Sequence, residues 1–269
     1  MAKVFVFCVG GTGIRVMKSV IMLAASGMKT NGYDIVPIII DPHVDLEENT
    51  ILTTMVGDYI KIYKNATSGA AQQIDAPNGF FNTKILRLED LDNQQNPMGA
   101  NMAEKKSFGQ YLNIGSLAND DVNNYLIQTL YSKENLCNSL SVGFKGNPNV
   151  GTVVLNEMIS GADWYDSFQR HCEKGDRVFI ISSIFGGTGA SGYPLLEKKI
   201  KEDEAHPQIS NAVLGAVTVL PYYSLDDPTT SGSDIDSANF YTKTKAALSY
   251  YEKSVKSDYL YYAGEQSLR

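Results

Sequence analysis

The sequence predicts an α/β protein with a doubly wound, mostly parallel sheet that carries helices on both faces. Short apolar runs, typical of strands buried on both faces, alternate along the chain with segments of helical periodicity. Two of these runs, residues 4–9 and 179–185, lead through glycine-rich turns directly into a helical pattern. The length of 269 residues is sufficient for one large domain of this kind.

The first strand is predicted at residues 4–9, which are β-branched, aromatic or otherwise apolar, and it runs into a Gly-Gly-Thr-Gly turn at 10–13. Apolar residues then recur at helical spacing as far as Met28. Residues 35–40 predict a second buried strand, which ends at Asp41. An acidic residue at this place often contacts a ribose or a hydrated metal, and the alternative is a helix cap or turn residue.

From about residue 45 to residue 140 the apolar pattern loosens, and Asn, Gln and Gly are frequent. Within this part, residues 85–88 predict a short strand and residues 120–131 predict a capped helix. We interpret 45–140 as an insertion on a single domain that spans residues 1–269. The insertion carries either a surface for a partner or irregular packing, and the sequence leaves both open.

Residues 143–151 contain three glycines and a proline, and we expect a shaped loop there rather than a linker. Helices are expected next at residues 152–159 and 164–171. A buried strand that begins at residue 177 then leads to the second glycine-rich turn, at 186–192.

This second turn is predicted to open a helix. Pro194 suits the first turn of that helix, where a missing N–H group costs nothing. The charge run at 197–204 predicts a solvated face of the same helix. A buried strand at 212–220, a helix at 241–253 and a short strand at 259–262 complete the pattern.

Composition disfavours several classes of function. Thirty acidic residues against 23 basic ones give a net charge of −7, which disfavours nucleic acid or an anionic membrane as a partner. No apolar run approaches 18 residues, so we expect no membrane-spanning helix. The three scattered cysteines favour a reduced, cytoplasmic compartment. The three histidines share no metal-ligand spacing with them, so we expect no metal site built from protein ligands.

Both glycine-rich turns have the features of a phosphate-binding site. Glycine lets the backbone approach a ligand closely, and free N–H groups at the N-terminus of a helix favour an anion. Neither turn contains a lysine, so backbone N–H groups would have to hold the phosphates. The alternative is a tight strand-to-helix connection that binds nothing.

An NAD(P)-dependent oxidoreductase of the Rossmann type is the alternative within the nucleotide-binding class. Residues 11–16 begin like the fingerprint G-x-G-x-x-G, but Val16 stands at the third glycine. Such an enzyme has no need of a second glycine turn after a later strand, whereas a nucleoside triphosphate held from two sides does. We therefore favour a site that uses both turns.

Three motifs in this order resemble the tubulin/FtsZ superfamily. Residues 10–13 are similar to the family's first phosphate loop, and residues 146–151 (Gly-Asn-Pro-Asn-Val-Gly) to the loop that senses the γ-phosphate in FtsZ. Residues 186–192 resemble the tubulin signature G-G-T-G-x-G, with Phe185 in place of a first glycine. The resemblance covers nearly the whole chain outside 45–140 and is to the N-terminal GTPase domain of a prokaryotic tubulin-like protein.

The resemblance implies a tubulin/FtsZ-like domain that binds GTP or GDP, with Mg²⁺ carried by the nucleotide. It also implies head-to-tail polymerisation, so self-association or filament partners are expected in a cytoskeletal system. Asp41 would lie near the nucleotide and its magnesium, Asp226 near the ribose, and Asn239 near the base. The nucleotide-binding residues that we expect are Gly10, Gly11, Thr12, Gly13, Asp41, Gly146, Asn147, Gly186, Gly187, Thr188, Gly189, Ala190, Ser191, Asp226, Asn239 and Glu265.

Two departures from the family pattern bear on activity. Glu265 stands where the family has an asparagine that reads guanine, and a carboxylate can accept from guanine N1–H and the 2-amino group. The sequence stops before the family's central helix, acidic activating loop and second domain. We therefore expect nucleotide binding with little hydrolysis and assign no catalytic residue. A third interpretation is a nucleotide-free module that keeps the fold and binds a protein through the 45–140 insertion.

Overall fold

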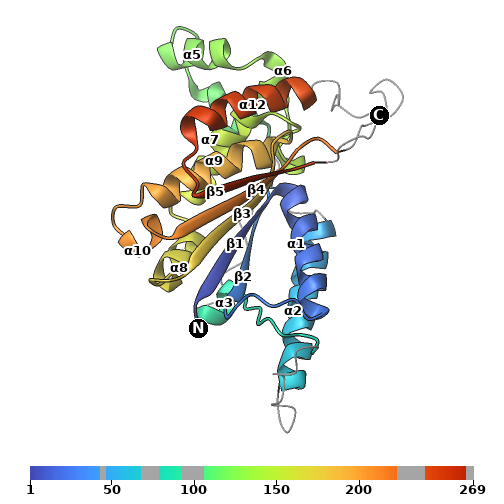
Figure 1. The fold of residues 1–269 in the computed structure, drawn as a ribbon. Helices are drawn as coiled ribbons and strands as arrows, with labels where there is room; N and C mark the ends of the chain where they lie inside the picture. Colours follow the sequence, from blue (N-terminus) through green and yellow to red (C-terminus); the bar gives the residue numbers. More distant parts are fainter. Residues whose placement is uncertain (43–46, 68–78, 93–105, 223–239, 265–269) are drawn as a thin grey trace, which may run out of the picture.

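A computed structural model describes residues 1–42, 47–67, 79–92, 106–222 and 240–264. These residues form a five-stranded, wholly parallel sheet flanked by helices (Figure 1), which confirms the predicted fold class. The strands are β1 (Lys3–Val9), β2 (Asp34–Ile40), β3 (Arg177–Ser183), β4 (Val213–Val219) and β5 (Tyr259–Ala263). Their order across the sheet is β2-β1-β3-β4-β5.

The longer helices connect or cover these strands, and several short ones lie between β2 and α7. The α-helices are α1 (Gly10–Ala25), α2 (Glu47–Thr67), α3 (Leu88–Leu91), α4 (Phe108–Tyr111), α5 (Val122–Leu130), α6 (Lys133–Cys137), α7 (Pro148–Ile159), α8 (Asp163–His171), α9 (Gly187–Lys201), α10 (Pro207–Ser210) and α12 (Phe240–Ser254). Two 3₁₀ turns, η1 (Ile114–Ser116) and η2 (Leu140–Val142), accompany them. No helix in the described ranges is long and apolar enough to cross a membrane.

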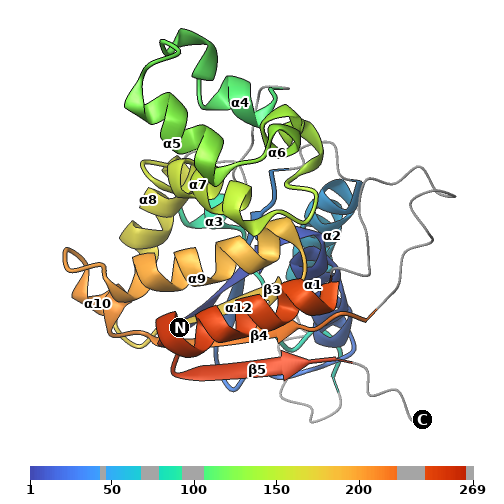
Figure 2. The ribbon, with the colours of Figure 1, turned by 90° about the horizontal axis from the view of Figure 1, so that it is seen from above.

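The order of the strands places helices on both faces of the sheet. From β1 the chain moves one way to β2, and from β3 it moves the other way to β4 and β5. Because parallel crossovers are right-handed, the helix after β1 must pack on the face opposite to the helices after β3 and β4. Figures 1 and 2 show this arrangement, with α1 and α2 on one face and α7, α9 and α12 on the other.

Each face of the sheet has its own apolar core. On one face, residues of α1 such as Ile14 and Met17 pack with buried residues of α2. On the other, Phe7 of β1 makes edge-to-face contacts with Trp164 and Phe168 of α8, with ring centroids 6.2 and 5.1 Å apart. The helix α2 is not among the elements that the sequence pattern predicts, yet it supplies Leu52, Val56, Tyr59 and Ile60 to the core.

The strand predicted at residues 85–88 is reduced to a single bridge. Ile85 forms a parallel bridge with Ile35 of β2. The Ile35 amide donates to the Lys84 carbonyl, and the Leu86 amide donates to the Ile35 carbonyl, both at 2.9 Å. The next outward-facing amide on β2 would belong to residue 37, which is a proline with no N–H to donate. Pro37 therefore explains why the ladder ends here, and α3 begins shortly after, at Leu88.

The predicted place of Pro194 in the first turn of its helix is wrong. The helix α9 begins at Gly187, so Pro194 lies in its interior and cannot donate to the carbonyl four residues earlier, that of Ala190. The hydroxyl of Tyr251, on α12, donates to this carbonyl at 3.2 Å. A side chain from a neighbouring helix thus satisfies the acceptor that the proline leaves free.

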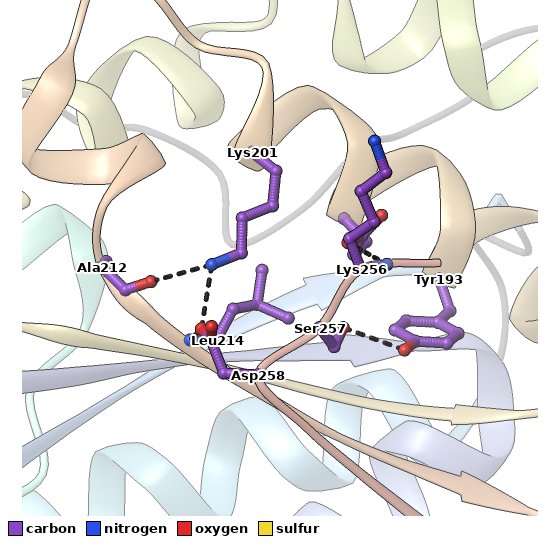
Figure 3. Close-up of polar contacts among 8 residues, drawn as sticks. Tyr193, Lys201, Ala212, Leu214, Lys256, Ser257 and Asp258 are labelled. Carbon is purple, nitrogen blue, oxygen red and sulfur yellow. Dashed lines mark hydrogen bonds and ion pairs between the residues drawn. The ribbon is translucent and has the colours of Figure 1, made fainter. Parts of the chain in front are cut away.

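The charge run at 197–204 does not form a wholly solvated face, because Glu197 is only 2% exposed. Three side chains of α9 instead contact the connection from α12 to β5 (Figure 3). The contacts join the hydroxyls of Tyr193 and Ser257 at 3.0 Å, the Glu197 carboxylate and the Lys256 amide at 2.7 Å, and the Lys201 ammonium and the Asp258 carboxylate at 2.9 Å. These contacts fix the middle and the C-terminal part of α9 against the edge of the sheet.

The other helix predictions are confirmed, with shifted ends. The helix predicted at 120–131 is α5, whose N-cap Asp121 accepts a hydrogen bond from the Asn123 amide at 2.7 Å. The helix predicted at 152–159 begins earlier, at Pro148, so residues 148–151 are the first turn of α7 and not part of a loop. Proline at the first helical position is favoured because its missing N–H is not needed there.

Candidate functional site

The candidate site lies at the carboxyl ends of β1 and β3. The order of the strands reverses between these two neighbours, and in open α/β sheets the crevice at such a point is where ligands bind. The first glycine-rich turn follows β1 directly at Gly10, and the second begins at Gly186, three residues after Ser183, the last residue of β3. The topology alone therefore brings the two turns to the same place.

The turns are in contact with each other, and each is itself the start of a helix. The helix α1 begins at Gly10, which has a φ of +71°, a conformation that favours glycine. A β-carbon at Gly10 would lie 3.3 Å from Cβ of Thr188 and 3.5 Å from the amide nitrogen of Gly189. The first turn of α1 and the first turn of α9 thus form one surface.

A third segment, residues 143–147, lies against the same surface. A β-carbon at Gly187 would be 2.7 Å from Cβ of Phe144, 3.2 Å from the amide nitrogen of Gly146 and 3.3 Å from that of Asn147. Gly143, with a φ of +78°, faces the hydroxyl oxygen of Thr188. The motif at 146–151 is 35 residues or more before 186–192 in sequence, and the fold brings the two together.

The positive ends of three helix dipoles meet at this point. The helices α1, α7 and α9 all begin here, and the residues before them, Val9, Asn147 and Gly186, provide no side-chain cap. The first turns of these three helices contain no acidic residue. In each helix, therefore, no carboxylate of the first turn neutralises the positive end of the dipole, and this arrangement favours an anion.

Several predicted residues have packing roles. A β-carbon at Gly13 would be 2.6 Å from the carbonyl oxygen of Ile181, so this glycine lets α1 lie close to the sheet. The Ser191 hydroxyl donates to the carbonyls of Gly187 at 2.7 Å and Thr188 at 3.3 Å, inside α9. The carbonyl of Ala190 accepts from Tyr251. Gly11 and Thr12 are partly exposed in the first turn of α1.

Asp41 lies at the same edge of the sheet as the glycine turns. Ile40, the last residue of β2, pairs with Val9, the last residue of β1, so Asp41 and Gly10 leave the sheet at the same level. The Asp41 side chain is 7% exposed. The other acidic and amide residues expected at the ribose and base, Asp226, Asn239 and Glu265, lie outside the described residues.

Sequence analysis missed the serine at the end of β3. A β-carbon at Gly189 would lie 2.5 Å from the carbonyl oxygen of Ser183 and 2.8 Å from its hydroxyl oxygen. A β-carbon at Gly186 would lie 3.0 Å from the same hydroxyl. Ser183 thus fills the inside of the second glycine turn, and its position three residues before Gly186, at the end of the apolar run, was the available signal.

Two cationic side chains, on α1 and α12, were not among the predicted residues. The Arg15 guanidinium, on α1, contacts the Glu48 carboxylate at 3.2 Å and donates to the Tyr222 hydroxyl at 3.3 Å. The Lys243 ammonium, on α12, donates to the carbonyl of Gly146 at 2.8 Å. Lys243 is 97 residues from Gly146 in sequence, so no local pattern could have indicated this contact.

Cys8 and the possible metal ligands are the remaining reactive side chains to place. Among the described residues no group of three or more His, Cys, Asp and Glu side chains could hold a metal ion. Cys8, two residues before Gly10, is fully buried, and burial raises the pKa of its thiol well above the usual range. A thiol in that state is a poor nucleophile.

Comparison with known proteins finds a similarity among solved structures. No protein-family profile matches the chain, and no curated protein sequence matches it. Among solved structures, the chain is similar to CetZ from Methanosaeta thermophila strain DSM 6194, with 16% identity and a TM-score of 0.40. The alignment covers 98% of this chain and 46% of the CetZ chain, so this chain spans about half the length of that protein.

Proposed function

We propose that this chain is a nucleotide-binding domain that holds the phosphates of GTP or GDP, and that it belongs to a tubulin/FtsZ-like, filament-forming system. The observation that carries the proposal is the meeting of three glycine-containing segments, 10–13, 143–147 and 186–189, where the strand order reverses. Residues 10–13, 146–151 and 186–192, which resemble motifs of the tubulin/FtsZ superfamily, overlap these segments.

The physical basis of binding is the backbone. Glycine at positions 10, 187 and 189 lets the first turns of α1 and α9 pack closely against Thr188, Phe144 and Ser183, which brings the backbone of the three segments together. Free N–H groups of these turns donate to phosphate oxygens, and the dipoles of α1, α7 and α9 favour the negative charge. Thr188, which lies against both Gly10 and Gly143, adds a hydroxyl.

Magnesium would enter this site with the nucleotide. Mg²⁺ is usually held by substrate phosphates together with one or two carboxylates, and Asp41 leaves the sheet beside Gly10. When bound, the ion neutralises phosphate charge. The preference for guanine rests on the resemblance, because the residues assigned to the base lie outside the described part of the chain.

The test is to identify the nucleotide directly. The purified protein is denatured, any released nucleotide is identified by ion-exchange chromatography, and the emptied protein is titrated with GTP, ATP and NAD in the presence of Mg²⁺. Release of a guanine nucleotide, or preferred binding of GTP, supports the proposal. Preferred binding of NAD would make the chain a dinucleotide enzyme, and binding of none of the three would leave the fold as a protein-binding module.

A further inference from the structure

We propose that Lys243 is a cationic phosphate ligand of this site, supplied from α12 because the glycine-rich turns at 10–13 and 186–192 contain no lysine. The inference rests on the proposed function and deepens it. Its basis is the position of the ammonium: Nζ of Lys243 is 2.8 Å from the carbonyl oxygen of Gly146. Gly146 has a φ of +71°, and a β-carbon there would be 3.2 Å from Nζ.

The ammonium is adjacent to the surface where the three segments meet. The amide nitrogens of Gly146 and Asn147 would lie 3.2 and 3.3 Å from a β-carbon at Gly187, the first residue of α9. Lys243 therefore contacts a residue that is itself packed on the start of α9. The flexible four-carbon side chain of lysine allows the ammonium to move from the Gly146 carbonyl to a ligand at the start of α9.

The charge of Lys243 is not balanced by a protein carboxylate. Within the ranges that the structure describes, no Asp or Glu oxygen lies within 4.0 Å of its Nζ, although other lysines such as Lys3, Lys61 and Lys201 have such partners. The carbonyl of Gly146 uses one of the three N–H donors of the ammonium and carries no net charge.

The side chain of Lys243 is half-buried. A cation in this position, close to the starts of α7 and α9, is best stabilised by an anion that accepts its remaining donors. A polyphosphate bound where the three segments meet provides such an anion. The ammonium would then add a full positive charge to the partial charges that the backbone N–H groups supply.

The test compares variants of one helix. Lys243→Met removes the charge and keeps most of the side-chain length, Lys243→Arg keeps the charge, and Lys245→Met removes an equal charge from an exposed position on α12. Binding of GTP, and competition by inorganic pyrophosphate, are measured for each variant at several salt concentrations. The thermal midpoint of each variant is measured in parallel.

We expect Lys243→Met to lower the affinity for GTP and for pyrophosphate by about tenfold or more, which corresponds to the loss of one charged hydrogen bond. Lys243→Arg should retain most of the affinity, and Lys245→Met should stay within about twofold of the parent because exposed charges are well screened. The salt dependence of binding should be weaker in Lys243→Met, because one direct ionic contact has been removed.

Two results would overturn the inference while leaving the proposed function in place. The first is a Lys243→Met variant that binds GTP and pyrophosphate as the parent does. The second is a Lys243→Met variant that binds GTP and pyrophosphate more weakly, but that keeps the salt dependence of the parent and has a lowered thermal midpoint. That result would mean that Lys243 only anchors the loop at Gly146. A parent protein that binds neither probe refutes the proposed function and the inference together.

Discussion

Replacing Gly187 with alanine tests the contact between the second and third glycine segments. The new β-carbon would lie 2.7 Å from Cβ of Phe144, about 1 Å closer than carbon atoms in normal contact. Phe144 is buried, and its Cβ moves only with the backbone, so residues 144–147 must shift away from α9. Overpacking of this kind costs about 1–3 kcal/mol of folding free energy.

The same shift displaces the amides of Gly146 and Asn147 from the start of α9. We therefore expect Gly187→Ala to lower the thermal midpoint by about 2–12 °C, taking about 2–4 °C per kcal/mol for a chain of this size. GTP affinity should fall by about tenfold or more, the equivalent of one hydrogen bond to a charged group. Scanning calorimetry and isothermal titration measure the two effects.

Gly57 provides the matched control for this variant. It lies inside α2, and a β-carbon there would meet nothing within 4 Å. Gly57→Ala should therefore stabilise the protein by about 0.5–1 kcal/mol, because alanine loses less conformational entropy in a helix, and should leave GTP binding unchanged. If Gly187→Ala matched the parent in both stability and affinity, the close packing of the three segments would be refuted.

Three further predictions concern stability. Tyr251→Phe should cost about 1–3 kcal/mol because it leaves a buried carbonyl of α9 unpaired, and Pro194→Ala should recover part of this loss by restoring an N–H donor; chemical denaturation of the single and double variants measures both. Burial raises the pKa of the Glu197 carboxyl, so its stabilising contribution is present below about pH 4.3 and is lost as the pH rises. Glu197→Gln should thus gain stability relative to the parent as the pH rises from 4 to 7. A difference in unfolding free energy between variant and parent that stays constant over this range would contradict the prediction. A double-mutant cycle of Arg15→Ala and Glu48→Ala should give a coupling below about 1 kcal/mol, because the pair is half-exposed, and a larger value would show a desolvated pair.

The strands and the two glycine turns could be predicted because their signals are local. Buried parallel strands appear as continuous apolar runs, and glycines after them indicate a tight connection to a helix. That both turns meet at one edge followed from the parallel sheet. The sequence also contained a signal for α2 that was overlooked: Leu52, Val56, Tyr59 and Ile60 have helical spacing within an otherwise polar segment.

Other features depend on tertiary contacts that no local pattern contains. The sequence pattern predicts a loop at these glycines, followed by a helix. Close packing on Ser183 and Phe144 instead makes them the first turn of α9, and so Pro194 lies in the helix interior. The charge run appeared solvated, but the connection from α12 to β5 covers Glu197. Lys243 reaches the site from the far end of the sequence.

The central claim is that segments 10–13, 143–147 and 186–189 bind the phosphates of one nucleotide together. Hydrogen–deuterium exchange with and without GTP and Mg²⁺, followed by mass spectrometry, tests it most directly, since amides that bind phosphate exchange more slowly. The account predicts slower exchange in all three segments at the same GTP concentration. Slower exchange in 10–13 alone, or in none of the three, would contradict it.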